Sequence, residues 1–226
     1  MKKTLFTVAL CCVGLVASAQ QSNDQASRVS LQMGMAFPSG DFKSTELSNI
    51  KSGYAHDGVF ISASYTQDLN KNFGVGATWA YRNHPFNIAP YAEKYEAYAY
   101  EIEADPYVSI YATIDAYAQL PLNKFTAYAK GSAGYGAFRP AALSGTVVYE
   151  NGSTLQFSSD PGRSGSGVYG IAGGVRYNFG HFGLGAELGM IAAKPEFNVV
   201  IDGEVKDLKQ PMHTTNLSLA LSYRLN

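Results

Sequence analysis

The 226-residue sequence has almost no cysteine, no long apolar segment after its first residues, and no surplus of charge. Its only cysteines, Cys11 and Cys12, lie in the N-terminal apolar segment, so the rest of the chain can form neither a disulfide nor a cysteine metal site. No later segment is apolar for about 18 consecutive residues, which excludes a transmembrane helix. The formal net charge is −1 without basic clusters, which argues against nucleic acid as a partner.

The N-terminus carries the three parts of an export signal. Lys2 and Lys3 are followed by an apolar run over residues 5–16, and Ala17-Ser18-Ala19 is a small-residue cleavage site before Gln20. The run is short for a membrane anchor, and no stop-transfer charges follow it. We predict a signal peptide over residues 1–19 that is removed on export.

Apolar residues alternate with small or polar residues in eight later stretches. In the last one, Leu217, Leu219 and Leu221 fall on one face of a strand, because successive side chains point to opposite sides. Ser218 and Ser222 fall on the other face. An apolar outer face and a polar inner face are typical of strands in a membrane-spanning barrel. The predicted strands are Arg28–Phe37, Asp57–Leu69, Asn72–Asn83, Tyr107–Leu120, Phe125–Phe138, Val168–Phe179, Phe182–Ala193 and Thr214–Leu225.

The connections between these strands alternate in length. Leu69–Lys71, Pro121–Lys124 and Gly180-His181 are tight turns, and the four other connections are long. Short periplasmic turns and long extracellular loops are the rule in outer-membrane barrels. We therefore predict an all-β fold: an eight-stranded, antiparallel, up-and-down transmembrane β-barrel with both termini in the periplasm.

Two of the long connections contain hairpin signals. Asn151-Gly152 and Asp202-Gly203 each lie between alternating segments, and these pairs supply the positive φ of a two-residue turn. We predict β-ribbons above the membrane from Thr146 to Phe157 and from Phe197 to Leu208. The connection His84–Pro106 can form a third ribbon, with Ala89–Glu93 at its tip.

With this signal, these strands and these loops, the chain resembles the small outer-membrane β-barrel proteins. That group includes the OmpA transmembrane domain, OmpX, OmpW and the porin-family barrels of Bacteroidota, and Ser18-Ala19-Gln20 resembles their export signals. The resemblance covers residues 28–226, after a short segment over residues 20–27. It implies outer-membrane lipid, lipopolysaccharide and the barrel-insertion machinery as partners, a monomer, and no cofactor. The chain departs from the family's pattern in its end, Tyr223-Arg224-Leu225-Asn226, which lacks a terminal aromatic residue.

Because successive side chains of a strand point to opposite faces, the residues between the outward-facing ones face into the barrel. This places large residues such as Tyr111, Tyr117 and Tyr128 opposite glycines such as Gly74 and Gly174. An eight-stranded barrel is just wide enough for side chains to fill it. The sequence thus predicts a filled interior in place of an open pore.

Charged residues also fall on the predicted inner faces. Asp115 and Lys130 are equally distant from the middle of the Pro121–Lys124 turn, which makes them cross-strand neighbours and predicts an ion pair. We expect it to form part of a network, which satisfies itself or acts as an electrostatic gate. Its members are Asp115, Lys130, Arg176, Glu187, Arg224 and Arg82.

No motif predicts catalytic residues or a metal site. His56, His84 and His213 lie near the predicted outer rim without metal-ligand spacing, and no serine stands at a convincing offset from His213. The acidic, aromatic stretch Tyr91–Pro106 is a solvated ribbon or a contact surface made by Tyr91, Tyr95, Tyr98 and Tyr100. We expect a non-enzymatic, structural or porin-like protein whose loops bind a ligand or partner. The alternatives are a narrow conduit for small or apolar solutes and a lipid-modifying enzyme at the rim.

Overall fold

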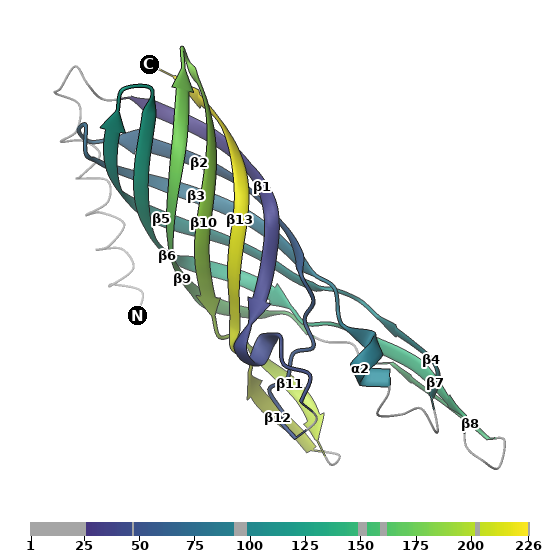
Figure 1. Ribbon diagram of the computed structural model, residues 1–226. Helices are drawn as coiled ribbons and strands as arrows, with labels where there is room; N and C mark the ends of the chain where they lie inside the picture. Colours follow the sequence, from purple (N-terminus) through teal and green to yellow (C-terminus); the bar gives the residue numbers. More distant parts are fainter. Residues whose placement is uncertain are drawn as a thin grey trace, which may run out of the picture.

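The computed structural model describes residues 26–46, 48–92, 99–148, 153–158, 162–201 and 204–225. Strands that each pair antiparallel with two neighbours make up most of it (Figure 1). They are β1 (Ser27–Ser39), β2 (Gly58–Asp68), β3 (Phe73–His84), β5 (Tyr107–Leu122), β6 (Phe125–Arg139), β9 (Ser164–Phe179), β10 (Phe182–Ala193) and β13 (Met212–Arg224).

These eight strands form a closed barrel in the order β1-β13-β10-β9-β6-β5-β3-β2. Closure is made by β1 and β13, which pair from Arg28 with Arg224 to Ser39 with His213. The predicted eight-stranded antiparallel barrel is confirmed, and the strand ends differ from the predicted ones by at most four residues. None of the described helices is long and apolar enough to cross a membrane.

The wall separates apolar and polar side chains by parity. Leu219 has 66% of its surface exposed on the outside, whereas its neighbour Ser218 has 3% exposed on the inside. The same alternation runs through every barrel strand, so large apolar side chains face outward and serine, threonine and charged residues face the lumen. This distribution reverses that of a water-soluble protein, and it suits a barrel surrounded by lipid.

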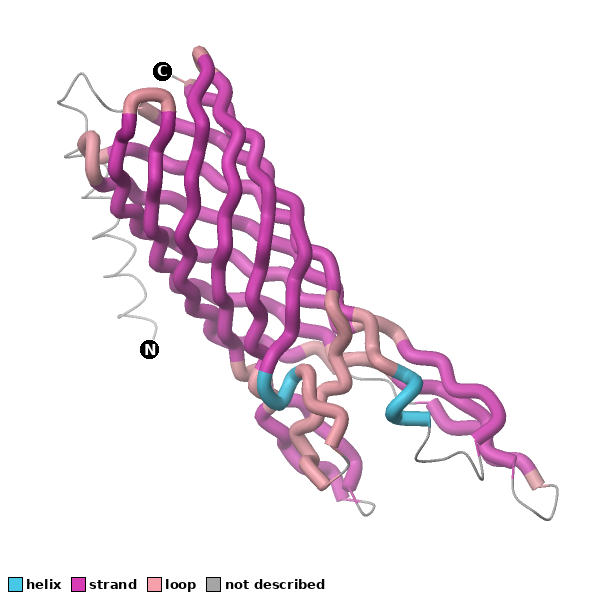
Figure 2. Tube along the Cα trace, in the orientation of Figure 1, coloured by secondary structure: helices cyan, strands magenta, loops and turns pink. Residues whose placement is uncertain are grey.

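The two ends of the barrel differ. At the turn end, the short connections 69–72, 123–124 and 180–181 join neighbouring strands (Figure 2). On the outer surface there, aromatic rings contact one another in a series from β6 to β13, with centroids 5.0 to 6.1 Å apart. The rings belong to Phe125, Tyr177, Phe179, Phe182 and Tyr223. Aromatic girdles of this kind mark a membrane interface.

The long connections at the loop end carry secondary structure of their own. η1 (Gly40–Phe42) follows β1, and α2 (Ile88–Ala92) lies between β3 and β4 (Ala99–Ala104). β4 pairs with β7 (Leu143–Val148), which pairs with β8 (Thr154–Ser158), while β11 (Glu196–Ile201) pairs with β12 (Glu204–Lys209). The two small sheets project separately beyond the barrel (Figure 1).

Hairpins are found at both predicted places, although their turn residues lie outside the described residues. Val148 pairs with Thr154, so the register of β7 and β8 does not fit the predicted two-residue turn at Asn151-Gly152, which would pair Val148 with Leu155. Ile201 pairs with Glu204, which is the register that a two-residue turn at Asp202-Gly203 requires. The predicted third ribbon is wrong, because Ala89 lies in α2 and β4 pairs with a strand of the next connection. The acidic segment therefore joins a sheet built by two loops.

Candidate functional site

The lumen is closed at the loop end by a side chain from the first long connection. Phe42 of η1 is completely buried, and its ring contacts the inward-facing rings of His84 and Tyr107 edge-on, with centroids 5.2 and 5.0 Å away. Tyr107 also donates a hydrogen bond to the carbonyl of Gly53, at 2.7 Å. The first connection thus folds back over the barrel mouth as a cap.

Below this cap, Arg82 of β3 is a buried cation without a carboxylate partner among the described residues. Its Nη2 donates to the hydroxyl of Tyr111 at 2.8 Å, and its guanidinium lies 5.7 Å from the Phe60 ring centre and 5.3 Å from that of Tyr111. Cation–π contacts with aromatic faces compensate part of the cost of burying this charge. Arg82 is therefore inside the lumen, as predicted.

An ion pair crosses the middle of the lumen from β6 to β10. Lys130 Nζ donates to Glu187 Oε1 at 2.8 Å, and the two side chains have 10% and 8% of their surfaces exposed. The hydroxyl of Tyr128 donates to the other carboxylate oxygen of Glu187, at 2.9 Å. A cavity of about 30 Å³, large enough for a water molecule, lies beside this pair.

The predicted Asp115–Lys130 ion pair is wrong. The β5–β6 turn contains only Asn123 and Lys124, because Leu122 pairs with Phe125, so the register shifts by two residues and Lys130 stands opposite Tyr117. Asp115 instead accepts hydrogen bonds from the hydroxyls of Thr78 and Thr113, at 2.5 and 3.0 Å.

Glycines give room to the large side chains of the lumen, as the sequence predicts. A β-carbon at Gly174 would come within 2.5 Å of the Tyr128 ring, and one at Gly76 within 3.2 Å of the Tyr117 ring. The tyrosines therefore lie over the glycine positions of neighbouring strands and fill space inside the barrel.

The turn end of the lumen is wider and contains a second polar network. Asp68 accepts a hydrogen bond from Gln119 Nε2 at 2.8 Å and forms an ion pair with Arg28 at 3.5 Å. Arg176 donates to Gln119 and to Asn178, at 3.3 and 3.1 Å. These groups line a cavity of about 360 Å³ at the barrel mouth. We call it the turn-end cavity.

Two arginines expected beside Glu187 lie elsewhere. Arg176 contacts Gln119, Asn178 and the face of Tyr128, and Arg224 is exposed at the edge of the turn-end cavity. The predicted network is thus divided into a central pair and a group at the mouth. The division follows from the position of Arg176 and Arg224 nearer to the ends of β9 and β13.

Of the four tyrosines predicted as a contact surface, only Tyr91 has a described side chain. It is half-buried and packs edge-on against Tyr54 and Phe86, with both centroids 5.5 Å away, so it belongs to the packing of the loops. Tyr95 and Tyr98 lie outside the described residues, and Tyr100 is described only as part of β4.

The rim histidines do not form a common site. His84 of β3 is buried below the cap, where its Nδ1 donates to the carbonyl of His56 at 2.9 Å. Within the described ranges, no group of three or more histidine, cysteine, aspartate or glutamate side chains could hold a metal ion. His84 therefore packs against Phe42 of the cap.

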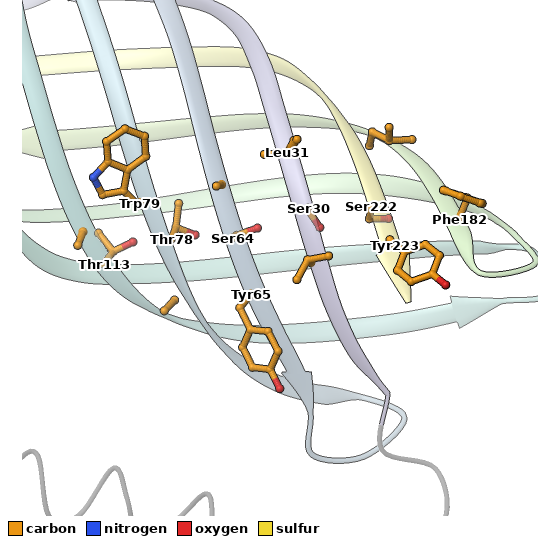
Figure 3. A pocket seen from close by; sticks show the side chains of 15 residues that line it. Ser30, Leu31, Ser64, Tyr65, Thr78, Trp79, Thr113, Phe182, Ser222 and Tyr223 are labelled. Atoms are coloured by element: carbon orange, nitrogen blue, oxygen red, sulfur yellow. The ribbon is translucent and has the colours of Figure 1, made fainter. Parts of the chain in front are cut away.

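The outer wall has a shallow apolar hollow of about 610 Å³ (Figure 3). Ala63, Ala77 and Ala112 form its floor, and larger side chains such as Tyr65 and Trp79 border it. These residues face outward, in the surface that lipid covers.

A closed barrel of eight antiparallel strands, apolar outside and filled with polar side chains, is the architecture of an outer-membrane β-barrel protein. The chain belongs to the family of the outer membrane protein beta-barrel domain, whose model matches residues 8–224. No curated protein matches the chain.

Solved structures share the fold at low sequence identity. Neisserial surface protein A is 12% identical with a TM-score of 0.50, over 87% of this chain and 96% of that chain. A major outer membrane protein from Thermus thermophilus is also 12% identical with a TM-score of 0.50, over 88% and 100%. Ail of Yersinia pestis is 15% identical with a TM-score of 0.48, over 89% and 99%. At 12% identity, the two similarities with a TM-score of 0.50 show the fold alone.

Two groups of site residues were missed in the sequence. Arg28 and Asp68 stand near the ends of predicted strands, and parity with the outward Val29 would have placed Arg28 inside. Phe42 lies in a connection without periodicity, so no sequence pattern indicates that it enters the barrel mouth.

Proposed function

We propose that the protein is a non-enzymatic outer-membrane barrel with a closed lumen, which holds the β-sheets of its loops above the membrane to contact a ligand or partner. The observation that carries this proposal is the filled lumen, with Phe42 over one mouth and the Lys130–Glu187 pair across the middle. A barrel closed in this way is suited to presenting its loops and unsuited to passing solutes.

The proposal includes the orientation and the maturation of the chain. The turn end faces the periplasm with both termini, and the two projecting sheets face outward, next to lipopolysaccharide. Residues 1–19 act as a signal peptide of the type found in Bacteroidota, the insertion machinery places the barrel in the membrane, and the barrel remains a monomer. The aromatic girdle and the unequal connections support this orientation.

Single-channel recording in planar lipid bilayers tests the closed lumen. We expect the purified wild-type barrel to give no discrete openings over a wide range of voltages. Insertion is checked in parallel by the slower or faster gel migration of unheated samples, which distinguishes folded barrels from unfolded chains. Frequent, reproducible openings of the inserted wild-type protein would contradict the proposal.

A narrow conduit is the second candidate, because cavities lie on both sides of the central ion pair. The cavity of about 30 Å³ borders Lys130 and Glu187 on one side, and the turn-end cavity of about 360 Å³ begins beyond Tyr128 on the other. If the pair were an electrostatic gate, Lys130→Ala would produce openings in the same recordings. A silent but folded Lys130→Ala barrel would favour the closed lumen.

A further inference from the structure

The turn-end cavity has an excess of positive charge. Among the described residues, its lining includes the cations Arg28, Lys71, Arg176 and Arg224 but only one carboxylate, that of Asp68. These residues give the lining a positive formal charge, even when His181, which also borders the cavity, is counted as neutral. In a partly enclosed space, water screens such charges less than at an open surface.

Arg28 is the member of this group whose hydrogen bonds are incomplete. Only 7% of its surface is exposed, its Nη2 faces Asp68, and its Nη1 is buried without a hydrogen-bond partner among the described residues. Leaving a buried donor of a charged group unpaired is costly. Arg28 lines the cavity, and an acceptor that reached its Nη1 from there would remove that cost.

Asp68 cannot supply acceptors for all the arginines of the cavity, because both of its carboxylate oxygens already face a partner. One of its oxygens accepts from Gln119 Nε2 at 2.8 Å, and the other faces Arg28 Nη2 at 3.5 Å. The hydrogen bonds that Arg176 donates within the described part of the chain go to neutral groups, the side-chain oxygens of Gln119 and Asn178. The positive charges of Arg28 and Arg176 repel each other, and Asp68 attracts Arg176 without forming an ion pair with it among the described residues.

We infer that the turn-end cavity is a binding site for a small oxyanion, a carboxylate or a phosphate, held between Arg28 and Arg176. Guanidinium groups match the oxygen spacing of both anions and bind them with charge-assisted hydrogen bonds. Arg224 and Lys71 at the edge of the cavity attract the anion from solution. The cavity, of about 360 Å³, is large enough for a phosphate with an organic substituent. We take the ligand to be a free solute that enters from the aqueous side of the turn end.

Calorimetric titration of the folded barrel in uncharged maltoside micelles tests this inference, with inorganic phosphate and acetate as probes at constant ionic strength. We expect one anion to bind per barrel. Arg28→Gln and Arg176→Gln should each weaken binding about tenfold or more, since each removes a charge-assisted hydrogen bond. Lys124→Gln is the matched control, because Lys124 lies at the same end, is exposed and does not line the cavity.

Phosphate binding assigns the phosphate class, and acetate binding without phosphate binding assigns the carboxylate class. The inference would be overturned if neither phosphate nor acetate bound, or if Lys124→Gln lost as much affinity as the arginine variants. Should Arg28→Gln fail to fold, as judged by gel migration, Arg28→Lys keeps the charge beside Asp68 and removes the fork of donors. It should then fold and bind more weakly than wild type, and unchanged binding would contradict the site.

Discussion

At the scale of single residues, the lumen depends on pairs of one very small and one large side chain. Tyr128 lies over Gly174, so its ring occupies the space where any other residue would place a β-carbon. Gly173, the residue before it, faces outward. A β-carbon there would have the Tyr128 carbonyl oxygen, at 3.7 Å, as its one neighbour within 4 Å. Neighbouring glycines in one strand therefore have different roles.

We expect Gly174→Ala to lower the free energy of unfolding by about 1–3 kcal/mol, the usual cost of overpacking, because Tyr128 must move away from Glu187. Gly173→Ala is the matched control and should change stability by less than about 0.5 kcal/mol. Urea unfolding in lipid vesicles, followed by the fluorescence of Trp79 on the outer wall, measures both. Equal losses would show that the glycines serve strand flexibility alone.

The central ion pair gives a second prediction at this scale. Lys130→Ala leaves Glu187 in the lumen with only the Tyr128 hydroxyl as a described partner, so we expect a loss of about 3–5 kcal/mol. The double variant Lys130→Met/Glu187→Leu should recover much of this loss, because it removes both charges. Unfolding free energies of Lys130→Met, Glu187→Leu and the double variant, each relative to wild type, give the coupling energy.

A second cycle, with Lys130 and Asp115, distinguishes the observed pairing of Lys130 from the one expected from the sequence. Coupling between Lys130 and Glu187 should exceed coupling between Lys130 and Asp115, whose carboxylate oxygens accept from Thr78 and Thr113. A larger coupling for Asp115 would contradict the structure of the central lumen.

At the scale of elements, the short turns set the register of the wall. Asn123 has φ of 58°, the left-handed conformation that a two-residue hairpin turn requires and that asparagine tolerates. With this turn, Leu122 pairs with Phe125 and every side chain of β6 obtains its partner on β5. A longer turn would move Lys130 away from Tyr117.

We expect Asn123→Gly to leave stability unchanged or slightly higher, because glycine adopts this φ without strain. Asn123→Val should cost about 1–2 kcal/mol, since a β-branched residue is disfavoured there. Urea unfolding in vesicles measures the two variants, and Lys124→Gln serves as a control for the loss of a polar side chain in the same turn. A tolerated valine would argue against the left-handed turn.

The projecting sheets give a further prediction at this scale. β7 and β8 pair only with β4 and with each other, so replacing residues 144–158 by a short glycine-serine linker should leave barrel folding intact. Gel migration and unfolding in vesicles measure the result. Failure of this variant to insert would show that the sheet assists folding of the barrel, contrary to the proposed role in contacting a partner.

The sequence predicted the wall well and the connections less well, for a physical reason. Alternation has a period of two residues, so parity alone decides whether a side chain such as Tyr111 or Glu187 faces inward. Register depends on turn length, and one misjudged turn moved Lys130 from Glu187 to Asp115 as its expected partner. Phe42 closes the mouth through contacts between loops distant in sequence, which no local pattern records.

At the scale of the whole molecule, apolar residues outside and polar residues inside leave the ends of the barrel as its contact with water. The loop end is covered by a cap and carries two sheets, whereas the turn end is open into a positively charged cavity. This asymmetry means that the two sides of the membrane meet different chemistry. The orientation of the barrel therefore decides which function each end can have.

Cysteine labelling tests the proposed orientation, because the chain has no cysteine after residue 12. Asp207→Cys places a thiol on exposed β12 at the loop end, and Lys124→Cys places one in the turn at the opposite end. On intact cells, a membrane-impermeant maleimide should label Asp207→Cys at once and Lys124→Cys only after the outer membrane is permeabilised. After permeabilisation, the wild-type chain should also remain unlabelled if the signal peptide, with Cys11 and Cys12, has been removed. The reverse labelling pattern would place the sheets in the periplasm, and labelling of the wild-type protein would mean that residues 1–19 are retained.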